Sequence, residues 1–209
     1  MGFSVFGGMM ATVAGDGIVE LQRRLLGGYQ LLQTLVGIRL RSVTDPQSVR
    51  HLTWLSDVTA AVELISRRMT VEGPLDFAGY LGEVAAFWTR ACEGRPVRLD
   101  VRGQSALLPD SHLLPLAIIT HELISNACRH AFPDNRRGSI AVAFSRAVGG
   151  VSLVVRDSGI GAATLEPGEG LRLVRGLVEH LGGSMTIETA PEAGVGVRIR
   201  LPLESLPSH

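Results

Sequence analysis

One segment, HELISNACRHAF (residues 121–132), has the apolar periodicity of a helix but carries polar side chains at a regular spacing. Glu122, Asn126 and His130 lie four residues apart, which places them along one stripe of that helix. The opposite side is apolar and consists of Leu123, Ile124, Ala127, Cys128 and Ala131. This pattern constrains the helix on both sides, because the apolar face must join a core while the polar stripe faces solvent or a ligand.

The chemistry of the stripe suits a complex of a metal ion with phosphate. Glu122 and Asn126 offer oxygen atoms to Mg²⁺ or to water, and Arg129, which flanks the stripe together with His121, offers donors to a phosphate. A solvated helix face is the alternative interpretation, and this helix by itself does not decide between the two.

The elements around this helix predict an α+β domain. The segment RPVRLDV, the pair SIAVAFS and GVSLVVRD, and the closing pair SMTIETA and GVGVRIRLPL have the alternation of strands. Helices are expected over residues 76–92, from Ser111 to the residue before Pro133, and over residues 170–181. Helices gathered on one face of a mixed or antiparallel sheet form an α/β sandwich.

Two glycine-containing segments follow the strands. DSGIG (residues 157–161) ends a strand with Asp157, a candidate acceptor for an exocyclic amine, while Gly159 and Gly161 let the backbone turn sharply and approach a ligand. About ten residues later, Gly168 and Gly170 open the next helix, whose free N–H groups can bind phosphate. Each segment alone is also found in ordinary turns.

The N-terminal third predicts a helical hairpin. Asp16 can cap a helix with apolar residues at alternating steps of three and four, namely Ile18, Leu21, Leu25, Gly28, Leu32 and Leu35. Asp45 and Pro46 fit the N-cap and first position of a second helix, with Leu55, Val58, Val62, Ile65 and Met69 at the same spacing. We expect the hairpin to dimerise into a four-helix bundle; the alternative is that both helices pack on the rest of the chain.

The amino-acid composition excludes several classes of partner and of catalytic site. The net charge is zero, so we expect no nucleic-acid partner, and all 20 basic residues are Arg, which excludes a Walker-type phosphate loop and a Schiff base. Cys92 and Cys128 lie in apolar helical patterns and are expected to be small buried side chains rather than zinc ligands. Residues 1–15 lack a basic region and are too short to span a bilayer, so we expect a flexible leader, no membrane segment and a cytoplasmic protein.

The order of these motifs resembles the ATP-binding domain shared by histidine kinases, gyrase B, Hsp90 and MutL, over about residues 75–203. The resemblance implies that Asn126 holds Mg²⁺, that Glu122 orients water or the metal shell, and that Asp157 binds the adenine amine of ATP or ADP. It also implies that Arg129 and His130 lie near the phosphates and that the adenine pocket and lid are shaped by Gly159, Gly161, Gly168 and Gly170. The expected division is a leader over 1–15, a dimerisation and phosphotransfer-like hairpin over 16–71, and an ATP-binding domain over 72–206.

Within that superfamily, ELQRRLLGGYQLLQTL and GLRLVRGLVEHLGG resemble bacterial two-component sensor kinases. His121 is similar to the subgroup named for His, Trp and Glu, although its Trp-x-Glu before DSGIG is missing, and RHAF resembles the sister subgroup. The alignment places Arg23 where the phosphoacceptor histidine stands, and a guanidinium cannot accept a phosphoryl group. Gly27–Gly28 replace the usual asparagines, and Glu169 brings a negative charge close to the expected phosphates.

These departures leave several hypotheses open. The first is a degenerate kinase that binds Mg–ATP or ADP without autophosphorylation at the usual site. The second is a non-catalytic dimeric adaptor or phosphotransfer-type protein that docks the receiver domain of a response regulator. A third is an active kinase in which Arg23 is an engineered change. His51 is expected to be a buried or half-buried structural residue near the seam of the second helix, with a phosphoacceptor role as the alternative.

Overall fold

The computed structural model describes residues 26–69, 76–92 and 94–203. The chain divides into two compact units, Met1–Glu72 and Gly73–His209. The expected leader over 1–15, the capping residue Asp16 and the position of Arg23 lie outside the described residues.

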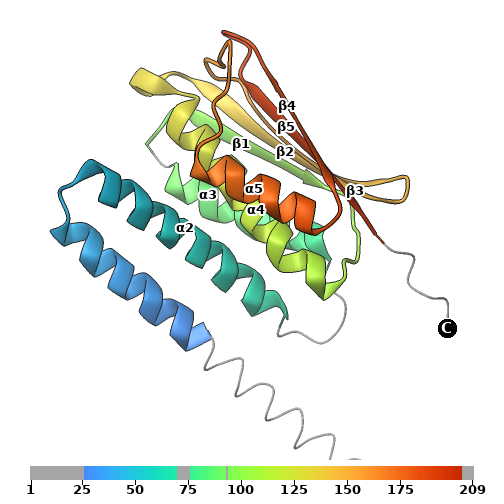
Figure 1. Ribbon diagram of the computed structural model, residues 1–209, viewed down its shortest axis with the longest axis horizontal. Coiled ribbons are helices and arrows are strands. Elements are labelled where there is room, and N and C mark those ends of the chain that lie inside the picture. The colour runs from blue at the N-terminus through green and yellow to red at the C-terminus, as the bar shows by residue number, and fades with distance from the viewer. Residues whose placement is uncertain (1–25, 70–75, 93, 204–209) are drawn as a thin grey trace, which may run out of the picture. The chain divides into compact units, whose positions relative to one another are not determined.

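The first unit contains the expected pair of helices. Residues 26–42 are helical, and α2 spans Pro46–Met69 after a short connection (Figure 1). Asp45 caps α2 as predicted, because its Oδ2 atom accepts from the Ser48 backbone N–H at 2.8 Å. Pro46 occupies the first helical position, where a backbone N–H would have no acceptor within the helix, so its absence costs no hydrogen bond.

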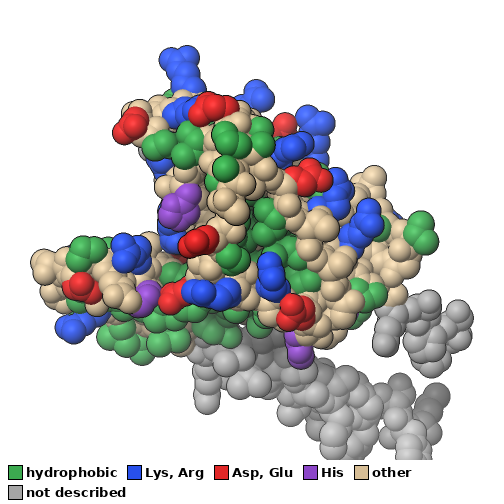
Figure 2. Space-filling view, turned by 45° about the horizontal axis from the view of Figure 1, so that its top comes forward, with side chains coloured by type: hydrophobic (Ala, Val, Ile, Leu, Met, Phe, Trp, Pro, Cys, Tyr) green, Lys and Arg blue, Asp and Glu red, His purple; other side chains and the backbone are tan. Residues whose placement is uncertain are grey.

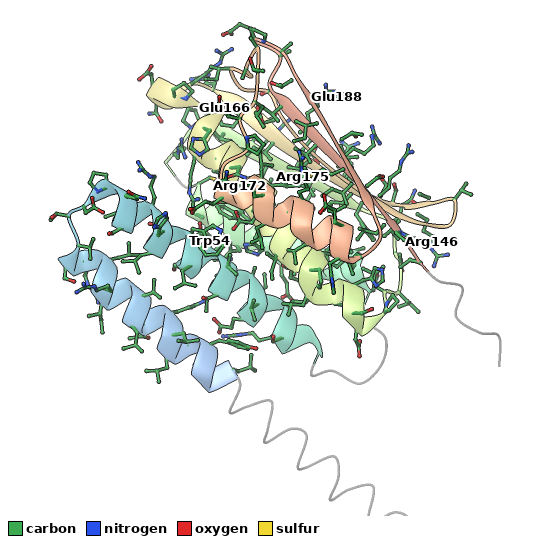
Figure 3. The ribbon with its side chains drawn as sticks, in the orientation of Figure 1. Trp54, Arg146, Glu166, Arg172, Arg175 and Glu188 are labelled. Carbon is green, nitrogen blue, oxygen red and sulfur yellow. The ribbon has the colours of Figure 1, made fainter. Side chains whose placement is uncertain are left out.

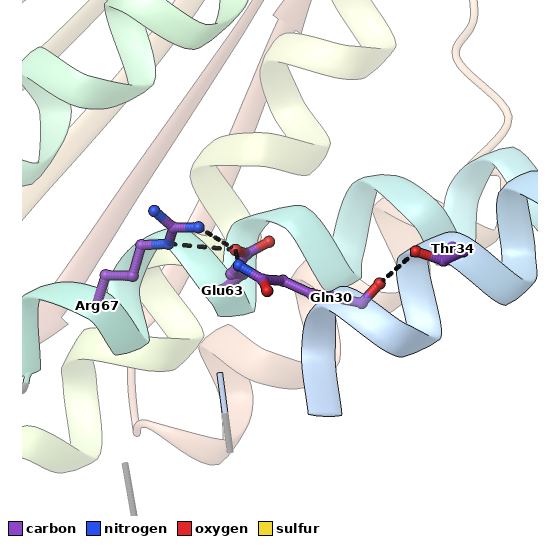
Figure 4. A network of polar contacts seen from close by, with 4 residues as sticks. All are labelled: Gln30, Thr34, Glu63 and Arg67. Carbon is purple, nitrogen blue, oxygen red and sulfur yellow. Dashed lines mark hydrogen bonds and ion pairs between the residues drawn. The ribbon is translucent and has the colours of Figure 1, made fainter. Parts of the chain in front are cut away.

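A polar network joins the two helices (Figure 4). Gln30 of the first helix donates from Nε2 to Oε1 of Glu63 on α2 at 3.3 Å. The same carboxylate oxygen accepts from Nε and Nη2 of Arg67 at 3.2 and 2.5 Å. Glu63 is 9% exposed, so these donors supply the partners that a buried carboxylate requires.

The predicted seam of the first helix is not buried within one chain. Leu32 and Leu35 are more than half exposed, as are Leu31 and Ile38, whereas Val36 is buried. A Cβ atom added at Gly27 or Gly28 would meet nothing within 4 Å, so no described segment of the chain packs closely against either glycine. The hairpin therefore leaves a row of large apolar side chains uncovered.

The expectation for His51 is wrong: its side chain is exposed rather than buried or half-buried. The buried residues of α2 lie in its second half, at Thr59, Ala61, Glu63 and Ile65. His51 lies in the second turn, next to the connection between the helices, where fewer neighbours cover it.

The second unit confirms the predicted order of helices and strands. It begins with α3 (Phe77–Ala91) and β1 (Val97–Gly103), continues with α4 (Asp110–His130), a short 3₁₀ turn η1 (Pro133–Asn135), β2 (Gly138–Ala147) and β3 (Gly150–Asp157), and ends with α5 (Glu169–His180), β4 (Ser184–Thr189) and β5 (Val195–Pro202). The strands form one sheet in the order β1-β2-β3-β5-β4. β1 pairs parallel with β2 and the other pairings are antiparallel, so the sheet is mixed.

The register of the sheet gathers its apolar side chains on one face. Phe144 of β2 pairs with Leu153 of β3, which pairs in turn with Ile199 of β5, and all three are buried. Their chain neighbours Ala143, Arg198 and Arg200 are exposed on the other face. The helices α3, α4 and α5 lie along one face of the sheet (Figure 1), which makes this unit a two-layer sandwich.

Packing between α3 and α4 includes a histidine with an unusual environment. His121 is 1% exposed and lies beside the rings of Phe87 and Trp88, at centroid distances of 5.5 and 5.8 Å. Neither ring nitrogen has a hydrogen-bond partner among the residues that the structure describes. Burial lowers the pKa of His121 from 6.5 to about 4, so the imidazole is neutral in the folded chain at neutral pH.

No helix in the described ranges is long and apolar enough to cross a membrane.

The burial of His121 predicts a pH-dependent stability. Between pH 6.5 and pH 4 the unfolded chain binds a proton at this residue that the folded chain does not bind. The free energy of unfolding therefore decreases as the pH is lowered through this range, by roughly 3 kcal/mol in total. His121→Phe should flatten this part of the curve, as measured by urea unfolding at several pH values. His180→Gln, at an exposed position at the end of α5, is the control and should leave the slope unchanged. An unaltered slope in His121→Phe would contradict this assignment.

Candidate functional site

The polar stripe of α4 lies where its sequence spacing predicts. Glu122 is 1% exposed, Asn126 is half-buried, and Arg129 and His130 are exposed in the last turn. The apolar side of the same helix joins the core at Leu123, Ile124, Ala127, Cys128 and Ala131. The stripe is thus not a uniformly solvated face, because its first carboxylate is covered by protein.

The start of α5 provides that cover. Gly168 is the N-cap of α5, and no side chain caps the helix there. A Cβ atom added at Gly170 would lie 2.5 Å from Oε2 of Glu122 and 3.4 Å from Nδ2 of Asn126. The first turn of α5 therefore rests against the two polar side chains of α4 through a residue that has no side chain of its own.

This contact has a favourable electrostatic sign. The first N–H groups of a helix have no intrahelical acceptors, and the helix dipole adds partial positive charge at that end. Glu122 lies beside this end of α5, while Arg172 and Arg175 extend from later positions of the same helix (Figure 3). Glu169, in the first turn, is exposed. The site thus combines a buried carboxylate, an amide and a helix N-terminus.

Asp157, at the end of β3, forms the second part of the site. Its Oδ1 atom accepts from the backbone N–H groups of Gly159 at 2.8 Å and Val195 at 3.2 Å. The residue is 6% exposed, and this burial raises the pKa of its carboxyl group. The two hydrogen bonds lower the same pKa and so offset part of that effect. Because both donors bind the same oxygen, the orientation of the carboxylate is fixed from one side.

The glycines of DSGIG are needed for close backbone contacts. A Cβ atom at Gly159 would overlap the carbonyl oxygen of Ala131, to which the Ile160 N–H donates at 3.0 Å. Gly161 has a φ of 56° and packs against the carbonyl oxygen of Ala190. The loop is therefore clamped between the end of α4 and the turn that joins β4 to β5.

The turn between β4 and β5 completes this clamp, and it was not predicted as part of the site. Glu192 donates its backbone N–H to the Ile160 carbonyl at 2.6 Å, and its side chain pairs with Arg136 at 2.7 Å. Gly194, with a φ of 72°, lies directly against Asp157, and Val195 supplies one of its donors. The sequence between these strands, PEAG, is typical of a turn, but it does not indicate which segment the turn contacts.

α4 links the two parts of the site. Glu122 and Asn126 contact the start of α5, and Ala131 contacts DSGIG five residues later, which corresponds to about 7.5 Å of helix rise. His130 lies between them, and partial burial, with the charge of Arg129 as a second cause, lowers its pKa. The structure thus brings DSGIG and Gly170 into contact with the expected residues of α4. Gly168 takes no part in this contact, because an added Cβ there would meet no described atom within 4 Å.

The donor set limits what metal the site could hold. Among the described residues, no group of three or more His, Cys, Asp and Glu side chains is placed to bind a metal ion. Glu122 and Asn126 offer one carboxylate and one amide, a set that suits Mg²⁺ only when phosphate oxygens and water supply the remaining ligands. Over the face seen in Figure 2, arginine and acidic side chains are interspersed.

Several known proteins are similar to this chain. Residues 112–205 match the family of histidine kinase-, DNA gyrase B- and HSP90-like ATPases. The chain is 26% identical over 210 residues to the sensor histidine kinase PdtaS of Mycobacterium tuberculosis, covering 92% of this chain and 41% of that protein. It is 24% identical over 206 residues to blue-light-activated histidine kinase 2 of Erythrobacter litoralis, covering 92% of this chain and 59% of that protein. The chain thus spans about two-fifths to three-fifths of these relatives.

Solved structures show the same fold. The histidine kinase domain of the blue-light-activated kinase EL346 of Erythrobacter litoralis superimposes with a TM-score of 0.67 at 21% identity, covering 83% of this chain and 96% of that domain. The histidine kinase AdeS of Acinetobacter baumannii gives a TM-score of 0.57 at 17% identity, covering 90% of this chain and 98% of that one. The predicted fold, a helical hairpin followed by a sandwich of the histidine-kinase ATPase type, is confirmed. The chain is thus similar to sensor histidine kinases, and its residues 112–205 match the model of the histidine kinase-, DNA gyrase B- and HSP90-like ATPases.

Proposed function

We propose that this chain binds Mg–ATP or Mg–ADP in its sandwich domain, over residues 72–206, and acts in two-component signalling as a degenerate histidine kinase. The observation that supports this proposal best is the contact of Gly170 with Glu122 and Asn126. It brings a helix N-terminus, which binds anions, beside an amide and a carboxylate that can hold a hydrated cation.

The residues present fit a nucleotide at each end of the site. Asp157 is buried and is held through Oδ1, which leaves Oδ2 as the acceptor for the adenine amine. The clamped DSGIG loop shapes the adenine side through Gly159 and Gly161. Gly168 and Gly170 would shape the lid at the start of α5, and Arg129 and His130, at the end of α4, would donate to the phosphates.

At the phosphate end, Asn126 would hold Mg²⁺ and Glu122 would orient water or the metal shell. When bound, the ion would neutralise charge on the phosphates. Glu169 at the start of α5 opposes phosphate binding in part, and its exposure keeps that charge in solvent, where it is screened.

The proposed defect lies in the hairpin, over residues 16–71. Arg23 stands at the position of the phosphoacceptor, and its guanidinium cannot take up a phosphoryl group. The exposed row Leu31, Leu32, Leu35 and Ile38 supports a homodimer through this hairpin, because a second copy would bury these side chains in a four-helix bundle.

A second candidate function is a non-catalytic adaptor or phosphotransfer-type dimer that docks the receiver domain of a response regulator. The same exposed apolar row favours it, since the hairpin offers a large contact surface that needs no nucleotide. In that case the sandwich would be a relic that gives no response to ATP or ADP.

A thermal-shift titration with Mg–ADP and Mg–ATP separates the two functions. Nucleotide at about one hundred times its Kd should stabilise the folded chain by about 2.7 kcal/mol and raise its melting temperature. Asn126→Ala should abolish the shift, because it removes the proposed metal ligand. No shift of the unmodified chain at millimolar nucleotide would favour the adaptor, and phosphorylation on histidine at normal stoichiometry would contradict the proposed defect.

Two glycines of α5 give a matched pair of variants. Gly170→Ala places a Cβ atom against Glu122 and must displace that buried carboxylate, so we expect the Kd for Mg–ADP to rise by about tenfold or more. Gly176→Ala, at an exposed position later in α5, meets no described neighbour within 4 Å and should leave the Kd within about twofold. Isothermal titration calorimetry measures both values. Equal affinities for the two variants would show that the Gly170 contact is not part of the binding site.

A further inference from the structure

A second site lies apart from the proposed nucleotide site, at the edge of the sheet formed by β1. A cavity of about 390 Å³ opens there between the end of α3, β1 and α4. Its walls include the apolar side chains of Trp88, Leu99 and Ile124 together with both cysteines of the chain. None of the residues assigned to the nucleotide lines it.

The two cysteines are separated by 36 positions in the sequence but lie in contact. Cys92 is the C-cap of α3 and Cys128 lies on the core face of α4, and their Sγ atoms are 3.2 Å apart. Both are reduced and less than one-tenth exposed. Because a disulfide bond is about 2.05 Å long, an approach of about 1.2 Å would join them.

Arg95 holds this pair in place. Its backbone N–H donates to the carbonyl oxygen of Cys92 at 3.0 Å, and its Nη1 donates to the carbonyl oxygen of Cys128 at 2.7 Å. One residue thus ties the backbones of both cysteines together. Two small side chains that only fill a core do not need such a connection. Here it holds the end of α3 and the last turns of α4 so that the two Sγ atoms stay in contact.

We propose that Cys92 and Cys128 form a redox-active dithiol, which a low-molecular-weight disulfide admitted through this cavity oxidises to an intrachain disulfide. The Cys92 thiolate attacks one sulfur of the small disulfide, forms a mixed disulfide and releases one thiolate. Cys128 then attacks the Cys92 sulfur and displaces the second thiolate. The two protons of the protein thiols pass to the released thiolates, so two protein thiols and one small disulfide yield one protein disulfide and two small thiols.

The order of attack follows from the surroundings of the two thiols. Burial raises the pKa of Cys128, and its hydrogen bond with Cys92 acts in the same direction, which disfavours Cys128 as the first nucleophile. Both cysteines line the cavity through which the reagent arrives, and Cys92, where α3 ends, is the more exposed of the two, at 8% against 6%. The bond would tie the end of α3 to the helix that carries Asn126.

Intact mass measured on the full reduced chain after incubation with oxidised glutathione tests this proposal. The unmodified chain should lose two hydrogen atoms and retain no glutathione. Cys128→Ala should keep glutathione on Cys92, because the resolving thiol is missing, and Cys92→Ala should remain unmodified. Alanine is chosen because it leaves no polar group in an apolar site.

The chain unfolded in guanidinium is the reagent control, since both thiols are then accessible. If both cysteines stay reduced in the folded chain under conditions that oxidise the unfolded chain, the proposal is overturned. A glutathione adduct that persists on the unmodified chain would equally overturn it, because Cys128 would then fail to resolve the mixed disulfide.

Discussion

The site depends on the contact between the first turn of α5 and the polar side of α4. Gly170 allows it, because any side chain there would meet the carboxylate of Glu122. The contact covers a carboxylate that is 1% exposed and sets the partial positive charge of a helix N-terminus beside it. α4 therefore joins the core through one side and forms the floor of the candidate site through the other. The proposed nucleotide site would need both sides of this helix, which would account for the regular mixture of apolar and polar side chains in its sequence.

Local features of the structure could be predicted from sequence because their causes are local. Asp45 and Pro46 start α2 through a side-chain cap and a fixed φ, and GVSLVVRD forms β3, in which Val151, Leu153 and Val155 are buried on the same face. The i, i+4 spacing of Glu122 and Asn126 places them on one stripe whatever the rest of the chain does. Even the start of α5 at Gly168–Gly170 follows from glycines that precede an amphipathic run.

What could not be predicted are contacts between segments that are distant in sequence. Nothing near Asp157 indicates that the N–H of Val195 binds it, because that bond depends on the pairing of β5 with β3. Cys92 and Cys128 meet only because α3 and α4 pack side by side. His51 was expected to be at least half-buried from helical spacing alone, which gives the direction of a side chain but not whether another element covers it.

Backbone amide chemical shifts of the ¹⁵N-labelled chain, recorded during titration with Mg–ADP, test most directly whether nucleotide binds along α4. We expect the changes to concentrate at residues 126–131, 157–161 and 168–170, with little change at Val97 and Leu99 beside the cavity at the sheet edge. Changes centred on that cavity, or none at millimolar Mg–ADP, would contradict a nucleotide site built on the contact between α4 and α5.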